Sequence, residues 1–378
     1  MDLVLGKPVD LTSSPPLART QGGSFAYQPV LDGWRAVSII LVAISHGGLG
    51  HLVPGGLGVT IFFFISGFLI TSLLLSEYEK DQQISLKNFY LRRFWRLSPP
   101  LMAYIVLSTL LILFSIKQFN ILEPLSAILY FANYYSIHWH YESVPFGPSP
   151  LKILWSLAIE EHFYIFFAPL MAFFAYTRNR LFALLVILLA APLLIRVGML
   201  VRDPETALEL GYIYMATETR IDSIAWGTLL AWLCSHVGTD KLKSFLDNKI
   251  AVGLSLALML LCLLIRDERF RESLRYSLQG LALISLFYVT LNGETLRGLR
   301  CVLASRLAVL IGKLSYSIYL YHWLALVLAN GLAGQDKLTP QWLAYYYLLT
   351  VGLSLASYRY IEQPSLALRK RYGSHASA

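Results

Sequence analysis

The chain has 378 residues, of which 56% are hydrophobic and only 14% are charged, with a formal net charge of +8. Soluble domains carry about a quarter charged residues, so this composition excludes an ordinary soluble globular protein. The excess of Lys and Arg is typical of cytoplasmic loops in membrane proteins and does not indicate a nucleic-acid partner. The three cysteines are widely spaced and form no CxxC pair, which indicates packing residues and no metal site or disulfide framework.

Apolar windows recur along most of the chain, and a bilayer-spanning helix needs roughly 20 mostly apolar residues. Residues 1–28 contain prolines and glycines without an apolar core and are predicted to form a flexible cytoplasmic tail. The predicted spans are 36–53, 57–76, 98–115, 157–176, 181–200, 221–237, 250–265, 277–292, 308–330 and 341–358. The sequence therefore predicts an all-α fold, a polytopic transmembrane bundle of about ten helices. It occupies residues 29–365 and is followed by a basic cytoplasmic tail, 366–378.

The distribution of basic residues predicts the orientation of this bundle. Loops 77–97 and 293–313 are rich in Lys and Arg, which places them, with both termini, in the cytoplasm. Segment 138–150 then faces outward. Segment 118–150 is apolar only over a short stretch interrupted by Pro124, so we expect a re-entrant or interfacial segment. Segment 266–275 is an exception, because it carries four arginines on the outer side, largely offset by three acidic residues.

Arg35 and His46 lie in the first span, where an ionisable residue is costly and suggests function. Their separation of eleven residues places both on one helix face, about 16 Å apart along the axis. Arg35 would lie near the cytoplasmic end and His46 toward the outer half, which suits an extended cofactor with phosphates at one end. Alternatively, Arg35 reaches to lipid headgroups and His46 only bonds a neighbouring backbone group.

Arg93 and Arg96 precede the third span and share a helix face at i, i+3. Two neighbouring guanidinium groups can bind a phosphate bidentately. The alternative interpretation is ordinary positive-inside anchoring. Glu160 and Glu161, with His162, open the next span near its outer end. One of the two carboxylates is expected to orient His46, although the helix dipole alone accounts for one acidic residue at this position.

A weaker set of polar residues begins or lies within later spans. Arg220 and Asp222 open one span, Tyr319 and His322 share a face in another, and Glu362 closes the last. These residues either contact substrate or support the structure by hydrogen bonding. The sequence contains no HExxH, Walker or GxGxxG motif, so no metal or permanently bound cofactor is predicted.

In this order, these clusters resemble the acyltransferase-3 family of integral membrane O-acyltransferases. The resemblance rests on Arg35 followed by His46, the Gly58–Thr71 segment, Arg93-x-x-Arg96, Trp155–Tyr164, Ser315–Trp323 and Tyr360–Pro364. The family implies acyl-CoA used from the cytoplasm, an acceptor sugar on the far side, and the histidine and arginines as central residues. The chain departs from the family at Thr60, His162 and Tyr321. It is expected to be the stand-alone type, without a C-terminal esterase-like domain.

The resulting hypothesis is transfer of an acyl group, expected to be acetyl, from acyl-CoA to a hydroxyl of a cell-surface or lipid-linked carbohydrate such as O-antigen or exopolysaccharide. Arg93 and Arg96, with Arg35, would bind the phosphates of this co-substrate. His46 would act as general base or carry the acyl group itself. The expected location is the bacterial cytoplasmic (inner) membrane, in contact with membrane lipids. The alternatives are a transporter or flippase of a lipid-linked sugar, and an acyltransferase acting on a small molecule such as a macrolide.

Overall fold

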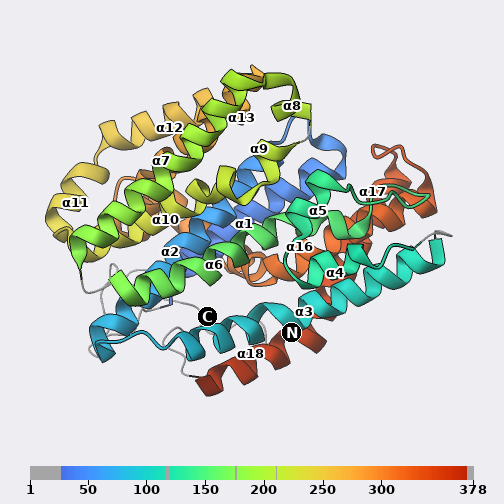
Figure 1. The fold of residues 1–378 in the computed structure, drawn as a ribbon, viewed down its shortest axis with the longest axis horizontal. Helices are drawn as coiled ribbons and strands as arrows, with labels where there is room; N and C mark the ends of the chain where they lie inside the picture. The colour runs from blue at the N-terminus through green and yellow to red at the C-terminus, as the bar shows by residue number, and fades with distance from the viewer. Residues whose placement is uncertain (1–26, 116–118, 175–176, 210, 373–378) are drawn as a thin grey trace.

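The computed structural model describes residues 27–115, 119–174, 177–209 and 211–372, and these residues form a helical bundle (Figure 1). In these ranges the only β-type pairing is one bridge between Val144 and Gly147. The long helices are α1 Pro29–Ile44, α2 Gly55–Asp81, α3 Leu86–Ser115, α6 Trp155–Phe174, α7 Arg178–Arg202, α10 Thr217–His236, α12 Lys249–Leu264, α14 Leu274–Asn292, α16 Arg306–Ala333 and α17 Pro340–Ser357.

Short helical segments connect them. The α-helical ones are α4 Leu122–Ile128, α5 Ala132–His138, α8 Pro204–Glu209, α9 Tyr212–Met215, α11 Thr239–Leu246, α13 Glu268–Glu272, α15 Arg297–Leu303 and α18 Gln363–Arg369. Two π-helical turns, η1 Ser45–Leu49 and η3 Tyr358–Glu362, follow α1 and α17. Two 3₁₀ turns, η2 Pro150–Leu154 and η4 Lys370–Tyr372, precede α6 and follow α18. The segment predicted as re-entrant or interfacial thus contains two short helices and a 3₁₀ turn.

Six helices of the described chain are long and apolar enough to cross a membrane, and up to eight if each of two bent pairs counts as one span. The bent pairs are α11 with α12, at 56°, and α15 with α16, at 57°. Helix α10 was also predicted to be a span, but it carries Glu218, Arg220 and Asp222 in its first two turns. These charges are tolerated because α10 packs inside the bundle against α2, α7 and α14. The count of ten spans and the side on which the termini lie remain predictions.

The centre of the bundle is the crossing of α2 and α10 (Figure 1). A Cβ atom added at Gly67 would overlap the carbonyl group of Ile224, and one added at Gly227 would overlap that of Phe64. The two backbones therefore touch, as small residues allow in membrane helix packing. In the apolar window of α2, 78% of the residues are buried, against 22% in α7. Helix α7 accordingly leaves most of its surface exposed on the outside of the bundle.

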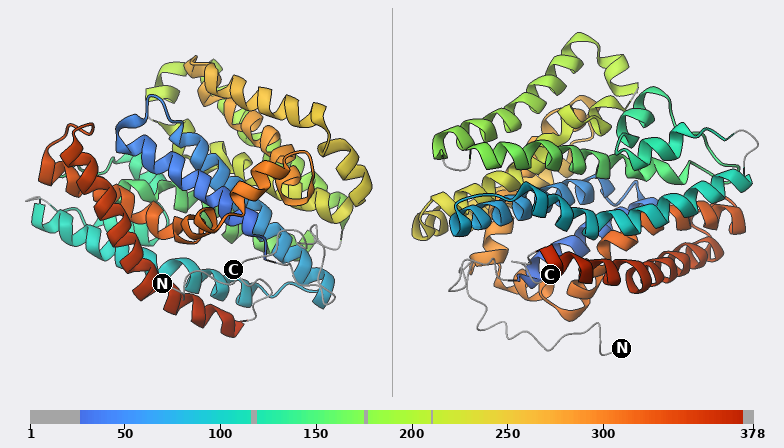
Figure 2. Two further views of the ribbon diagram at one scale, coloured as in Figure 1. Left: turned by 180° about the vertical axis from the view of Figure 1, so that it is seen from behind. Right: turned by 60° about the horizontal axis from the view of Figure 1, so that its bottom comes forward.

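The C-terminal end of the described chain lies along α3. Helix α18, at the start of the predicted C-terminal tail, packs against α3, and both views in Figure 2 show the two side by side. The Ser365 hydroxyl donates a hydrogen bond to the carbonyl oxygen of Trp95. The segment predicted as loop 77–97 is mostly helical, because α2 continues to Asp81 and α3 already begins at Leu86. Arg93 and Arg96 therefore lie on a helix, in agreement with the shared face predicted from their i, i+3 spacing.

Candidate active site

A partly open cavity lies among α1, α2, α3, α6 and α16. Its polar lining residues come from all five helices: Arg35, Ser66, Arg93, Arg96, Ser156, Glu160, Ser315, Tyr316 and Tyr319. The remaining lining is apolar, including Phe62, Phe63 and Ile70. Three arginines predicted as cofactor ligands from separate parts of the sequence thus share one cavity.

A fourth arginine, Arg369 on α18, joins this group. Burial, followed by the charges of Arg93, Arg35 and Arg92, lowers the pKa of Arg369. Arg35 is paired with Asp32 at 3.0 Å, and the Arg93 guanidinium lies over the ring of Tyr164, 3.7 Å from its centroid. The carboxylates of Asp32, Glu160, Glu161 and Glu362 interact electrostatically with these arginines, and neighbouring guanidinium groups are suited to bind phosphate bidentately. Sequence reasoning missed Arg369 because it follows the last predicted span, where a basic residue looks like ordinary anchoring.

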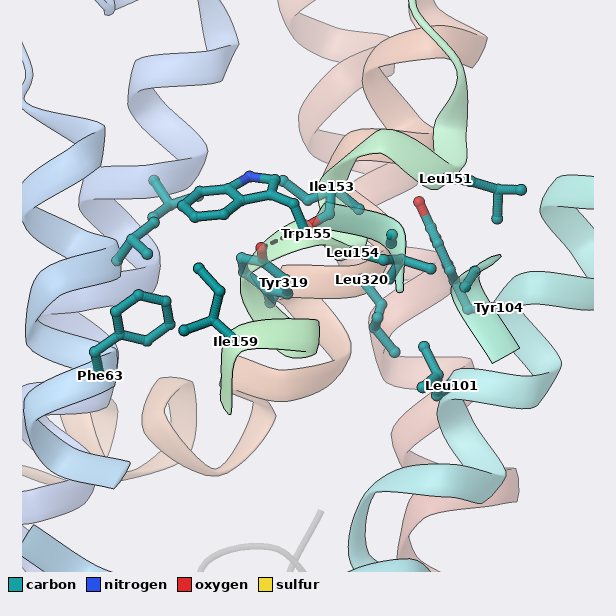
Figure 3. Close-up of a cluster of buried hydrophobic side chains, with 14 of the residues drawn as sticks. Phe63, Leu101, Tyr104, Leu151, Ile153, Leu154, Trp155, Ile159, Tyr319 and Leu320 are labelled. Atoms are coloured by element: carbon teal, nitrogen blue, oxygen red, sulfur yellow. Dashed lines mark hydrogen bonds between the residues drawn. The ribbon is translucent and has the colours of Figure 1, made fainter. Parts of the chain in front are cut away.

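Tyr319 lines this cavity and lies next to His322. Its hydroxyl donates to the carbonyl oxygen of Ile153 at 2.8 Å and, since its proton is used there, accepts from the Ser156 hydroxyl at 2.5 Å. Figure 3 shows Tyr319 among Trp155, Ile159 and the other apolar side chains of this layer. The Tyr319 ring centroid is 5.8 Å from that of His322. The cavity wall and the second predicted cluster are therefore contiguous.

His46 and His322 form a hydrogen-bonded pair. His46 lies in the π-helical turn η1 at the end of α1, and His322 is fully buried in α16. The Nδ1 atom of His46 is 2.9 Å from the Nε2 atom of His322, and the two rings are nearly parallel, at 6°. Helices α1 and α16 pack against each other along their length, which brings these distant residues together. Trp323 packs edge-on against the His46 ring, with centroids 4.8 Å apart.

The hydrogen bonds of this pair assign the protons of two neutral imidazoles. His322 Nδ1 lies 3.0 Å from the carbonyl oxygen of Ile318, which can only accept, so Nδ1 carries the proton. The Nε2 atom of His322 therefore carries no proton and accepts a hydrogen bond from the Nδ1–H group of His46. This leaves the Nε2 lone pair of His46 uncommitted to the pair. The arrangement produces a base or nucleophile of defined tautomer.

Glu160 and Glu161 were predicted to orient His46, and the structure gives this position to His322 instead. Glu160 lies one and a half turns into α6, lines the cavity and accepts a hydrogen bond from the Tyr164 hydroxyl at 3.1 Å. Both carboxylates interact electrostatically with Arg93. The Oε1 atom of Glu161 is buried and has no hydrogen-bond partner among the described residues. A buried carboxylate is stabilised by a cation, so both acids belong with the arginine cluster.

Arg220 and Asp222 have separate environments. Asp222 pairs with Arg196 of α7 at 2.7 Å, with both side chains fully buried. Arg220 stacks on Tyr276, 3.8 Å from the ring centroid, and its Nη2 atom is 3.5 Å from the Thr60 hydroxyl. Of the two interpretations left open for these residues, structural support fits Asp222. Arg196 was missed, although an arginine within the predicted span 181–200 was itself a signal of a buried partner.

In the described part of the chain, no group of three or more His, Cys, Asp or Glu side chains is placed to hold a metal ion. The ionisable groups of the site are the arginines, the carboxylates and the histidine pair. The fold and this site together define a helical membrane protein whose bundle contains a cavity lined by charged and hydroxyl side chains.

Comparison with known proteins identifies the family of the chain. It belongs to the acyltransferase family whose sequence profile, "Acyltransferase domain" (Acyl_transf_3), matches residues 29–359, which confirms the resemblance found in the sequence. O-acetyltransferase OatA of Staphylococcus aureus strain NCTC 8325 is 32% identical over 356 residues, covering 89% of this chain and 57% of that protein. The provisionally named O-acetyltransferase SAS0844 of Staphylococcus aureus strain MSSA476 is 30% identical over 360 residues, with the same coverage. The chain thus spans 57% of the length of these relatives. No solved structure matches it significantly.

Proposed function

We propose that the protein transfers an acetyl group from acetyl-CoA to a hydroxyl group of a carbohydrate. Family membership and the printed names of two relatives support an O-acetyl transfer. The observation that carries the proposal is one chain of contacts: the cavity lined by the arginines is also lined by Tyr319, whose ring lies next to His322, which is hydrogen-bonded to His46. This order of groups matches a long donor with phosphates at one end and a thioester at the other.

Arg93, Arg96 and Arg35 bind the phosphates of coenzyme A in this proposal, and Arg369 joins them. Guanidinium groups bind phosphate oxygens in a bidentate manner, which an array of four arginines on α1, α3 and α18 allows from several directions. Glu160 and Glu161 limit the positive charge of the empty site. The pantetheine arm then runs along the apolar wall formed by Phe62, Phe63 and Ile70.

His46 Nε2 removes the proton from the attacking hydroxyl, whose oxygen forms a bond to the thioester carbonyl carbon. The carbon–sulfur bond breaks, the ester leaves with the acyl group, and the proton passes from His46 to the coenzyme A sulfur. His322 holds the His46 ring and stabilises its positive charge during this transfer. In the alternative sequence, Nε2 attacks the thioester first and an acyl-histidine then reacts with the hydroxyl.

The acceptor is a free or lipid-linked glycan that reaches His46 from the outer side, while the donor enters from the cytoplasm. In a bacterial cytoplasmic membrane this arrangement would acetylate a cell-surface polysaccharide without moving coenzyme A across the bilayer. Membrane lipids would surround the bundle on faces such as that of α7.

The direct test measures coenzyme A release and ester formation by protein purified in detergent or liposomes, with radiolabelled acetyl-CoA and candidate sugars. Activity of the wild type that is lost in His46→Ala, at equal monodispersity and yield, supports the proposal. Release of coenzyme A at the same rate by both proteins would refute the proposal. Mass spectrometry of envelope glycans from a deletion strain would identify the acceptor and the acyl group together.

A further inference from the structure

The loop between α16 and α17, residues 334–339, closes over the turn that carries His46. The Nζ atom of Lys337 donates a hydrogen bond to the carbonyl oxygen of His46 at 3.4 Å. Next to it, Gly48 has a φ of +105°, which L-residues rarely adopt. A Cβ atom added there would lie 3.1 Å from the Cβ of Lys337 and 3.1 Å from the Cδ2 of Leu338. The loop and the turn are therefore in van der Waals contact beside the histidine.

Lys337 brings an uncompensated positive charge to this place. Its side chain is half-buried, burial lowers its pKa, and no carboxylate of the described chain lies within ion-pair distance of it. The neighbouring Asp336 accepts a hydrogen bond from the backbone of Leu338 instead. The ammonium group has three protons, and the bond to His46 uses one of them. At least one proton is thus left for a ligand beside His46.

The other groups that face His46 do not supply such a charge. His322 of α16 accepts its proton, and Trp323 of the same helix contacts its ring. From α17, the Tyr346 and Tyr347 side chains lie next to Gly47. Among the described neighbours of His46, Lys337 is therefore the cation.

We infer that Lys337 is a catalytic residue that stabilises the negative charge on the acyl oxygen when the acceptor hydroxyl attacks beside His46. This inference rests on the proposed function. As the hydroxyl oxygen bonds to the carbonyl carbon, the carbonyl π electrons move onto its oxygen. They return when the carbon–sulfur bond breaks, and Lys337 keeps its proton throughout. A cation held beside such an oxyanion contributes strongly to acyl transfer.

The test compares Lys337→Met, Lys337→Gln and Lys337→Arg with the control Lys152→Met, which removes an exposed lysine from η2 at the same end of the bundle. Glutamine keeps a hydrogen-bond donor for the His46 carbonyl group but removes the charge. We expect kcat for acetyl transfer to fall about a hundredfold or more in the Met and Gln variants, since one oxyanion donor accounts for about 10²–10³ in rate. Arg should restore most of the rate, the KM for acetyl-CoA should stay within about twofold, and the control should match the wild type.

The pH–rate profile separates charge from loop anchoring. Without the neighbouring cation, protonated His46 is less unfavourable, so the acidic limb of the profile should move to higher pH in Lys337→Gln but not in Lys337→Arg. A Gln variant with wild-type kcat, or equal losses in Gln and Arg with unmoved limbs, would overturn the inference and leave only a structural contact. A wild type that transfers no acetyl group, or a fully active His46→Ala, would instead refute the proposed function.

Discussion

The Nδ1 atom of His46 lies 2.9 Å from the Nε2 atom of His322, although 276 residues separate them in the chain. Replacing His46 with Ala should abolish acetyl transfer, because the proposed base is lost. His322→Ala should lower kcat about a hundredfold, within the range of a positioned base, while the KM for acetyl-CoA stays unchanged. His236→Gln is the matched control, because His236 lies in the last turn of α10 and its ring bonds the backbone carbonyl oxygen of Trp232. A His322→Ala enzyme with wild-type kcat would contradict the role of the pair.

The arginine cluster should control the affinity for the donor. Arg93→Ala and Arg96→Ala are each expected to raise the dissociation constant of acetyl-CoA about tenfold or more, because a charged hydrogen bond is worth about 1.5–3 kcal/mol. Lys substitutions should restore affinity only partly, since Lys keeps the charge without the planar fork. Arg369→Ala should weaken binding in the same direction.

Isothermal titration calorimetry in detergent measures these affinities directly. Arg180→Ala serves as the control, because Arg180 is an exposed residue in the first turn of α7. Unchanged affinity in the Arg93→Ala/Arg96→Ala double variant would exclude phosphate binding at this cluster.

The contact between α2 and α10 should be intolerant of even one methyl group. Gly67→Ala and Gly227→Ala are expected to lower the melting temperature of the purified protein or prevent its accumulation, because the added Cβ would overlap a facing backbone carbonyl group. Gly253→Ala in α12 has open space around the new Cβ and should be neutral or slightly stabilising, by up to about 1 kcal/mol from helix propensity. Equal melting temperatures for all three variants would refute the close approach.

The buried pair of Arg196 and Asp222 should show strong coupling. Each single replacement, Arg196→Met or Asp222→Leu, leaves one charge buried without its partner and is expected to cost about 3–5 kcal/mol of stability. The double variant should be more stable than either single variant. A double-mutant cycle from thermal or denaturant unfolding in micelles tests this. Strictly additive effects would mean that the two side chains do not interact.

The sidedness of the loops is also testable. Single cysteines at Lys87 and Arg297, in a background without native cysteines, should react with a membrane-impermeant maleimide only after cells are opened. A cysteine at Glu142 should react in intact cells. All three positions are exposed in the structure. Labelling of position 87 from outside would reverse the donor and acceptor sides in the proposed function.

The sequence predicted the helical class and brought Arg35, Arg93 and Arg96 into one hypothesis, because charged side chains in apolar helices have few stable environments other than a shared polar interior. It did not predict the partner of His46. Helical spacing relates His322 only to its own helix, whereas the contact between α1 and α16 depends on tertiary packing. The adjacent pair Glu160 and Glu161 looked like a support for the histidine, yet helix α6 turns them toward the arginines.

The partner of Asp222 also depends on tertiary packing. Asp222 follows Arg220 by two residues, and side chains two apart on a helix do not face each other. Its carboxylate therefore turns to Arg196, on the preceding long helix.

The two histidines of the pair lie far apart in the sequence, in η1 and in α16, and this separation has a consequence for biosynthesis. His322 is translated 276 residues after His46, so no truncated chain ending before α16 contains both histidines. During synthesis the fifteen α-helices that precede α16 in the described chain form before the pair can. Two separately expressed halves, divided between α6 and α7, would each carry one histidine, and activity could return only when the halves assemble in the same bilayer.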